Sequence, residues 1–170
     1  MRLFFALWPD DVARKQFEAV GAVLPKERGR RVSPANLHLT LAFLGNVSED
    51  DVDELKAGMD AVQGEALTLV FDRAGWFRRA QVIWLAPSEV PDPLPRLVRG
   101  INGMARSRGL QVDDKPFRPH LTLARKATRF TKPEFDPIRW DIRDFCLVQS
   151  ITHATGPEYR ILQRRALTSA

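Results

Sequence analysis

The pentapeptide His-Leu-Thr-Leu-Ala occurs twice in this chain, at residues 38–42 and again at residues 120–124. The chain has three histidines, and two of them lie in this repeat. Two copies of one polar pattern indicate two copies of one structural unit that face each other. A pair of imidazoles, each on its own strand, is the minimal equipment for acid–base chemistry near neutral pH.

The alternation inside the repeat predicts strands with two different faces. A β-strand repeats every two residues, so His38 and Thr40 share one face while the neighbouring leucines share the other. The second copy places His120 and Thr122 together in the same way. A core needs hydrophobic residues rather than a repeated polar pair, so we expect both polar faces to line a cleft. The third histidine, His153, has no such context and is expected to lie in a hairpin.

The size and composition predict an ordinary soluble protein. The chain has 170 residues, 44% of them hydrophobic and 28% charged, which predicts one domain over residues 1–170. We expect no membrane span, because no apolar run approaches the roughly 20 residues that one requires. The apolar segment 2–7 is too short for a signal peptide and predicts a first strand. Cys146 is the only cysteine, which excludes an internal disulfide and predicts a reducing, cytoplasmic location.

The basic character of the chain points to an anionic partner. Its net charge is +5, which favours RNA or a nucleotide, although solubility alone explains such a charge equally well. Arginines cluster near the repeats: Arg28, Arg30 and Arg31 precede the first copy, and Arg118 and Arg125 flank the second. Arginine suits bidentate contacts with phosphate better than lysine does.

The order of elements predicts an α+β fold. Amphipathic spacing predicts helices over 12–24, 52–62 and 97–109, with Asp10 and Ser48 as N-caps of the first two. No Gly-rich phosphate loop is present, and no doubly wound alternation of strands and helices persists. We therefore expect two pseudo-symmetric lobes with mostly antiparallel sheets that line a central cleft, and helices outside. Strands are predicted over 2–7, 37–44, 67–71, 82–85, 120–124, 140–151 and 159–167, and connections over 25–36, 87–95 and 153–157.

Two other kinds of site compete with a histidine pair. A metal site needs a third or fourth ligand at suitable spacing, and Asp113 and Asp114 match no such pattern. A nucleophilic site is also disfavoured, because Cys146 lies in a strand-like run and no Gly-x-Ser-x-Gly elbow is present. We therefore expect neither a metal nor a cofactor.

Longer segments around the repeats carry a family resemblance. They are 2–7, 36–45, 117–125 and the Gly-Pro-x-Tyr of 156–159. With its two His-x-Thr-x motifs, the chain resembles the two-histidine (2H) phosphoesterase superfamily. More narrowly, it is similar to the bacterial and archaeal RNA 2′,3′-cyclic phosphodiesterases, also called 2′-5′ RNA ligases. One mild departure is the run Val-Gln-Ser at 148–150, where the family often has an acidic residue before the serine.

The resemblance implies a reaction and a role for each motif residue. It implies hydrolysis of a 2′,3′-cyclic phosphate at an RNA end to a 2′-phosphate, without a metal. By the same resemblance, His120 is the general base and His38 the general acid. Thr40 and Thr122 hydrogen-bond the phosphate oxygens, where fixed donors stabilise developing charge.

The resemblance also implies a binding surface around the motifs. Arg118 and Arg125 contact the phosphate, and Phe43 either stacks on the terminal base or packs beneath it. The expected substrate is RNA with a 2′,3′-cyclic phosphate end, or a small cyclic nucleotide, bound by a monomer. The sequence leaves open reversible 2′-5′ ligation and a non-catalytic module that binds RNA ends. The natural RNA and the direction of proton transfer are open as well.

Overall fold

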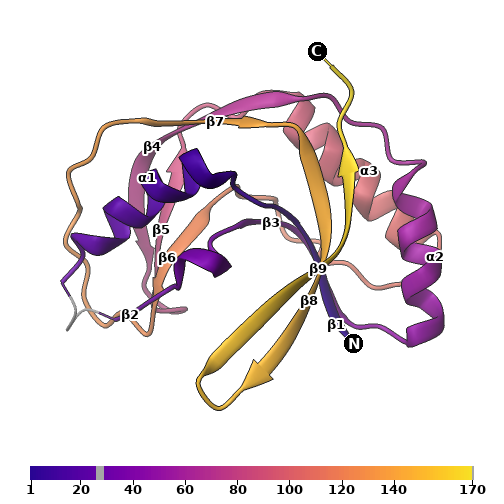
Figure 1. Ribbon diagram of the computed structural model, residues 1–170, viewed down its shortest axis with the longest axis horizontal. Helices are drawn as coiled ribbons and strands as arrows, with labels where there is room; N and C mark the ends of the chain where they lie inside the picture. The colour runs from indigo at the N-terminus through magenta and orange to yellow at the C-terminus, as the bar shows by residue number, and fades with distance from the viewer. Residues whose placement is uncertain (26–28, 170) are drawn as a thin grey trace.

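The computed structural model describes residues 1–25 and 29–169, so Arg28 of the arginine cluster lies outside the described residues. The chain folds as one twisted sheet with helices packed against it (Figure 1). The helices are α1 (Asp11–Ala22), the short 3-10 helix η2 (Pro34–Asn36), α2 (Glu49–Met59) and α3 (Pro93–Arg106). The strands are β1 (Arg2–Leu7), β2 (Arg30–Arg31), β3 (Leu39–Asn46), β4 (Leu67–Phe77), β5 (Val82–Pro87), β6 (Leu121–Arg125), β7 (Ile138–Ile142), β8 (Asp144–His153) and β9 (Gly156–Ala166).

The sheet divides into two lobes that meet at the motif strands. Its order is β7-β4-β5-β6-β3-β1-β8-β9, with β2 paired to β6, and every pairing between these strands is antiparallel. We call β3-β1-β8-β9 the first lobe and β6-β5-β4-β7 the second lobe. A single backbone pair, Leu39 with Leu121, joins them. The predicted α+β class with two lobes of antiparallel strands is confirmed.

The helices begin where the caps predict and cover the apolar side of the sheet. The Asp10 carboxylate accepts a hydrogen bond from the Ala13 backbone N–H at 2.8 Å, and the Ser48 hydroxyl accepts one from Asp51 at 3.2 Å. Such caps satisfy N–H groups that the first turn leaves unpaired. Helix α1 contacts β6 and β7 of the second lobe, whereas α3 contacts α2 and β3 of the first. No helix in the described ranges is both long and apolar enough to cross a membrane.

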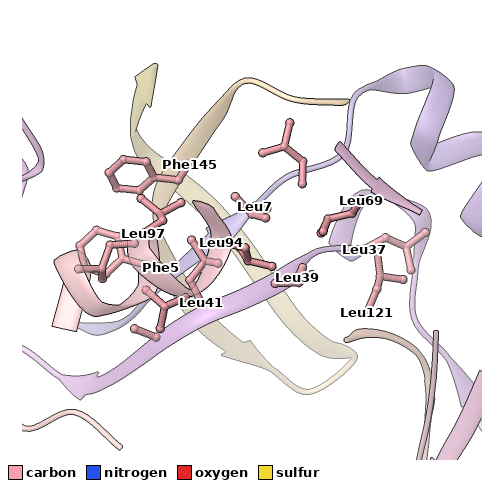
Figure 2. Close-up of a cluster of buried hydrophobic side chains, with 14 of the residues drawn as sticks. Phe5, Leu7, Leu37, Leu39, Leu41, Leu69, Leu94, Leu97, Leu121 and Phe145 are labelled. Atoms are coloured by element: carbon pink, nitrogen blue, oxygen red, sulfur yellow. The ribbon is translucent and has the colours of Figure 1, made fainter. Parts of the chain in front are cut away.

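The leucines of both motifs anchor the core. Leu39, Leu41 and Leu121 lie among side chains from α3 and from strands of both lobes, as Figure 2 shows. Each is buried, and burial of a leucine stabilises a fold by roughly 1.5–3 kcal/mol. Because side chains alternate along a strand, the buried leucines leave the histidines and threonines on the opposite face. The two-faced strands predicted from the repeat are therefore present.

Four segments differ from the sequence prediction. Strand β4 continues to Phe77, past its predicted end at residue 71. The prediction of one strand over 140–151 is wrong, because Arg143 separates two strands, β7 and β8. Strand β7 pairs with β4, whereas β8 pairs with β1 and β9. Both runs have the same local pattern, and only their distant partners separate them. Helix α3 begins at Pro93 inside a predicted connection, because proline fits the first turn of a helix. The predicted loop 25–36 contains β2 and η2.

Candidate functional site

The register between the lobes arranges the four motif side chains. The one pair that joins β3 and β6 lies between the polar residues of both motifs. Extended by one residue in each direction, this antiparallel register sets His38 beside Thr122 and Thr40 beside His120. Opposite neighbours in such a pair have Cβ atoms about 4.5–5.5 Å apart, and diagonal neighbours about 7–8 Å. The two histidines occupy a diagonal, which leaves room for a phosphate between their rings.

Both imidazoles are held in the same tautomer by the same kind of backbone contact. The Nδ1 atom of His38 lies 2.6 Å from the carbonyl oxygen of Asn36, and that of His120 lies 2.7 Å from the carbonyl oxygen of Arg118. A carbonyl oxygen only accepts, so Nδ1 carries a hydrogen in each ring. Each Nε2 is therefore left to take a proton when the ring is neutral, or to give one when it is charged.

Aromatic side chains surround the first histidine. The Trp8 ring stacks on His38 with 5.1 Å between centroids and 4° between planes, and Tyr159 stands against it at 5.1 Å and 83°. Phe4 lies 5.0 Å away at a tilt of 37°. The Nε2 atom is 3.2 Å from the Thr40 hydroxyl oxygen. The ring is therefore fixed in position, with only part of its edge open to solvent.

These surroundings set the charge of His38. Burial lowers the pKa of His38 to about 4, and the charges of Arg125 and His120 act in the same direction against the carbonyl of Asn36. The ring is thus neutral at pH 7 in the protein by itself. An anion bound beside it would oppose these effects and raise the pKa. The influence of Arg125 and His120 also shows that groups of the second motif lie within electrostatic reach of the first.

Three adjoining hollows form a cleft over the motif strands. A central hollow of about 420 Å³ shares Thr40 and Phe43 with an aromatic hollow of about 430 Å³ that His120 also lines. The central hollow shares His38 and Arg125 with a basic hollow of about 390 Å³. The cleft brings together every side chain that the sequence predicts for the site: His38, Thr40, Phe43, Arg118, His120, Thr122 and Arg125.

Phe43 presents its ring to the cleft. The residue is 42% exposed, and the guanidinium carbon of Arg2 lies 5.0 Å from the ring centre. A phenylalanine that packed beneath a ligand would be buried in the core, as its neighbours on β3 are. The exposure therefore favours stacking, one of the two roles that the sequence leaves open.

Sequence reasoning missed three residues that shape the site. Trp8 and Tyr159 flank the His38 ring, and the backbone of Asn36 fixes its tautomer. The only signals were the Gly-Pro-x-Tyr segment and the first residue of segment 36–45, which carry a family resemblance but indicate no role. Tyr159 reaches His38 because β9 pairs with β8 and β8 with β1, and periodicity alone does not reveal such pairings.

The competing kinds of site find no support in the described part of the chain. Burial raises the pKa of the Cys146 thiol to about 12, so no nucleophilic thiolate forms there near neutral pH. Asp113 forms an ion pair with Lys115 at 3.5 Å, and Asp114 forms one with Arg106 at 2.7 Å. Within the described residues, no group of three or more His, Cys, Asp or Glu side chains is placed to hold a metal ion.

Comparisons with known proteins bear on both halves of the chain. The family described as LigT like Phosphoesterase matches residues 7–84 and again residues 85–159, so each match contains one His-x-Thr motif. The RNA 2′,3′-cyclic phosphodiesterase of Escherichia coli strain K12 is 33% identical over 170 residues, which cover 98% of this chain and 97% of that protein. The protein of the same name from Thermus thermophilus is 34% identical, covering 98% and 90%.

Solved structures of related proteins have the same fold as this chain. The crystal structure of E. coli LigT complexed with 3′-AMP superimposes with a TM-score of 0.89 at 34% identity and covers 98% of both chains. The apo form of E. coli LigT gives a TM-score of 0.88. The resemblance drawn from the two motifs is therefore confirmed, and the chain belongs to the LigT-like phosphoesterases.

Proposed function

We propose that this protein hydrolyses 2′,3′-cyclic phosphate ends of RNA, or of small nucleotides, to 2′-phosphates by metal-independent acid–base catalysis. One observation carries the proposal: two imidazoles with the same anchored tautomer face one cleft from the residues just before the adjoining strands β3 and β6. The names of its relatives, RNA 2′,3′-cyclic phosphodiesterases, support the same substrate.

The proposed reaction moves one proton at each imidazole. Nε2 of His120 takes a proton from water while the water oxygen forms a bond to phosphorus. The bond from phosphorus to the 3′ oxygen breaks, and Nε2–H of His38 gives its proton to that oxygen. A 2′-phosphate and a 3′-hydroxyl result, and the two rings return to their starting states by exchanging protons with solvent.

The acid role requires a charged His38, and the substrate provides for it. The phosphodiester is an anion, and it would pair with Arg125, whose charge otherwise lowers the pKa of His38. Substrate and proton then bind together. The hydroxyl of Thr40 lies 3.2 Å from Nε2 and can donate to the neutral ring or accept from the charged one. Thr122 would donate to a phosphate oxygen from the other strand.

The remaining cleft residues would hold the rest of the substrate. Arg125 and Arg118 supply guanidinium groups for the phosphate, and Phe43 supplies an exposed ring for the terminal base. Both histidines come from one chain, so residues 1–170 would act as one bilobal unit and as a monomer. The single buried Cys146 fits a reducing compartment such as the cytoplasm.

Single and double substitution of the histidines tests the proposal. His38→Ala and His120→Ala should each lower turnover of adenosine 2′,3′-cyclic phosphate by roughly 10²–10⁴. The double variant should lose little more, because two groups that act as a unit are not additive. Activity should persist in the presence of a chelator. Near wild-type activity in both single variants would refute the mechanism, provided that circular dichroism shows an intact fold.

A further inference from the structure

The basic hollow extends the cleft beyond the reacting groups. It adjoins the central hollow at His38 and Arg125 and does not include His120. Four cationic side chains line it, whereas Glu158 is its one carboxylate among the described residues. That carboxylate bonds to Arg160 at 2.6 Å and to His153 at 2.7 Å. Among its described lining residues, the hollow therefore carries an excess of positive charge from four side chains: Arg30, Arg31, Arg125 and Lys126.

One wall of this hollow is the tip of the β8–β9 hairpin, which side chains from β2 and η2 hold in place. The guanidinium of Arg30 donates to the carbonyl of Thr155, and the Asn36 amide donates to the carbonyl of Pro157 at 2.9 Å. Gly156 has a φ of +131°, and a Cβ there would lie 3.0 Å from the guanidinium of Arg30. Only glycine combines this backbone with so close an approach. Hydrogen bonds and close packing therefore hold this wall in a defined position.

Three of the four cations keep N–H groups for a ligand, because Arg30 gives only one of its terminal nitrogens to the carbonyl of Thr155. Arg31 donates to the carbonyl of Ala22 at 2.8 Å and to that of Leu24, so it braces the end of α1. Arg125 and Lys126 take part in no ion pair within the described part of the chain. Lys126 also has a φ of +56°, which is uncommon for a residue with a side chain. Such strained positions cluster at binding sites, where the surrounding structure maintains them.

We propose that the basic hollow is a subsite for the phosphodiester on the 5′ side of the terminal nucleotide. This inference rests on the proposed function, which places the cyclic phosphate between His38 and His120. The next phosphate of an RNA chain is a permanent anion one nucleotide away, and a hollow of about 390 Å³ is within the usual size of ligand sites. Lys126 and Arg30 bind this second phosphate, while Arg125, which lines both hollows, lies between the two phosphates. The subsite thereby favours RNA ends over free cyclic mononucleotides.

Binding measurements test the subsite without any turnover. Adenosine 2′,5′-bisphosphate differs from adenosine 2′-phosphate only by a phosphate at the position of the upstream phosphodiester. By calorimetry the bisphosphate should bind about tenfold more tightly, as one charge-assisted contact predicts. Lys126→Gln should remove most of this gain, and Arg30→Gln should lower it as well, through both the lost guanidinium and the hairpin wall that this side chain holds. Lys15→Gln is the matched control, because exposed Lys15 on α1 lines none of the three hollows and should keep the full gain.

Kinetics then identifies what the subsite recognises. We would compare kcat/KM for adenosine 2′,3′-cyclic phosphate, its 5′-phosphorylated form and the dinucleotide ApA with the same cyclic end. Equal gains for the last two would assign the gain to phosphate. A gain for the dinucleotide alone would overturn the inference, and so would a bisphosphate preference that survives both Lys126→Gln and Arg30→Gln. No turnover of any substrate would contradict the proposed function instead, and the calorimetric result would still decide the subsite.

Discussion

Replacement of Trp8 should reveal which histidine is the acid. The indole stacks on His38 at 5.1 Å with 4° between the planes, so its face stabilises the charged imidazole more than the neutral one. A cation over an indole gains about 0.5–2 kcal/mol, and one pKa unit corresponds to about 1.36 kcal/mol. Leucine keeps an apolar side chain against the ring but lacks the aromatic face, so Trp8→Leu should lower the pKa of His38 by about 0.4–1.5 units from its value of about 4.

The consequence for rate depends on the role of the ring. If His38 is the acid, its charged form is a minority species above pH 4, and the pH-independent plateau of kcat/KM falls with that population. The plateau should then fall about 2- to 30-fold, by the same factor as the acid dissociation constant rises. If His38 were the base, its neutral form would already dominate, and a lower pKa would leave the plateau unchanged.

The assay is a pH profile of kcat/KM for a cyclic mononucleotide, combined with an NMR titration of His38. Trp8→Phe supplies an intermediate point, because phenylalanine is a weaker partner for a cation than tryptophan. Across wild type, Trp8→Phe and Trp8→Leu, the logarithm of the plateau should follow the pKa with a slope of one. A slope of zero would refute the acid role, and an unchanged pKa would refute the electrostatic interpretation of the stack. Phe77→Leu, beside His120, should leave the pKa of His38 unchanged.

Three further substitutions examine the frame of the site. Gly75→Ala should lower the free energy of unfolding by about 1–3 kcal/mol, because its Cβ would lie 2.2 Å from the Trp84 ring; an unchanged melting temperature would contradict this. Phe17→Ala should cost about 3–5 kcal/mol in urea unfolding, because this fully buried ring packs against two other aromatic rings; a loss below about 1 kcal/mol would disprove the packing. Thr40→Val should reduce kcat about 2- to 12-fold, as expected for one neutral hydrogen bond; a loss as large as that of His38→Ala would give the hydroxyl a larger role.

The elements with strong local signals were predictable from the sequence. The strand period placed His38 and Thr40 opposite buried leucines, and the structure shows this alternation. Asp10 and Ser48 cap the helices that the amphipathic spacing predicts. These features depend on residues within one or two turns of each other, so no knowledge of the tertiary fold is needed. The seven predicted site residues also gather in one cleft, although their roles remain proposals.

The features that depend on distant partners were not predictable in this way. The run 140–151 divides between the two lobes because its first part pairs with β4 and its second part pairs with β1. The aromatic setting of His38 comes from Trp8 after the first strand and Tyr159 on the last one. The hydrogen bond between Arg30 and Thr155 joins residues 125 positions apart. No local pattern encodes such contacts.

The single backbone pair between Leu39 and Leu121 determines when the site is complete. Each lobe contributes one imidazole at this seam, so a lobe by itself has a proton donor or a proton acceptor but never both. The lobes are not the two halves of the sequence, because β8 and β9 from the end of the chain lie beside β1 and β3. The pair is therefore complete only when the whole chain is folded, and opening of the seam would separate the two imidazoles without unfolding either lobe.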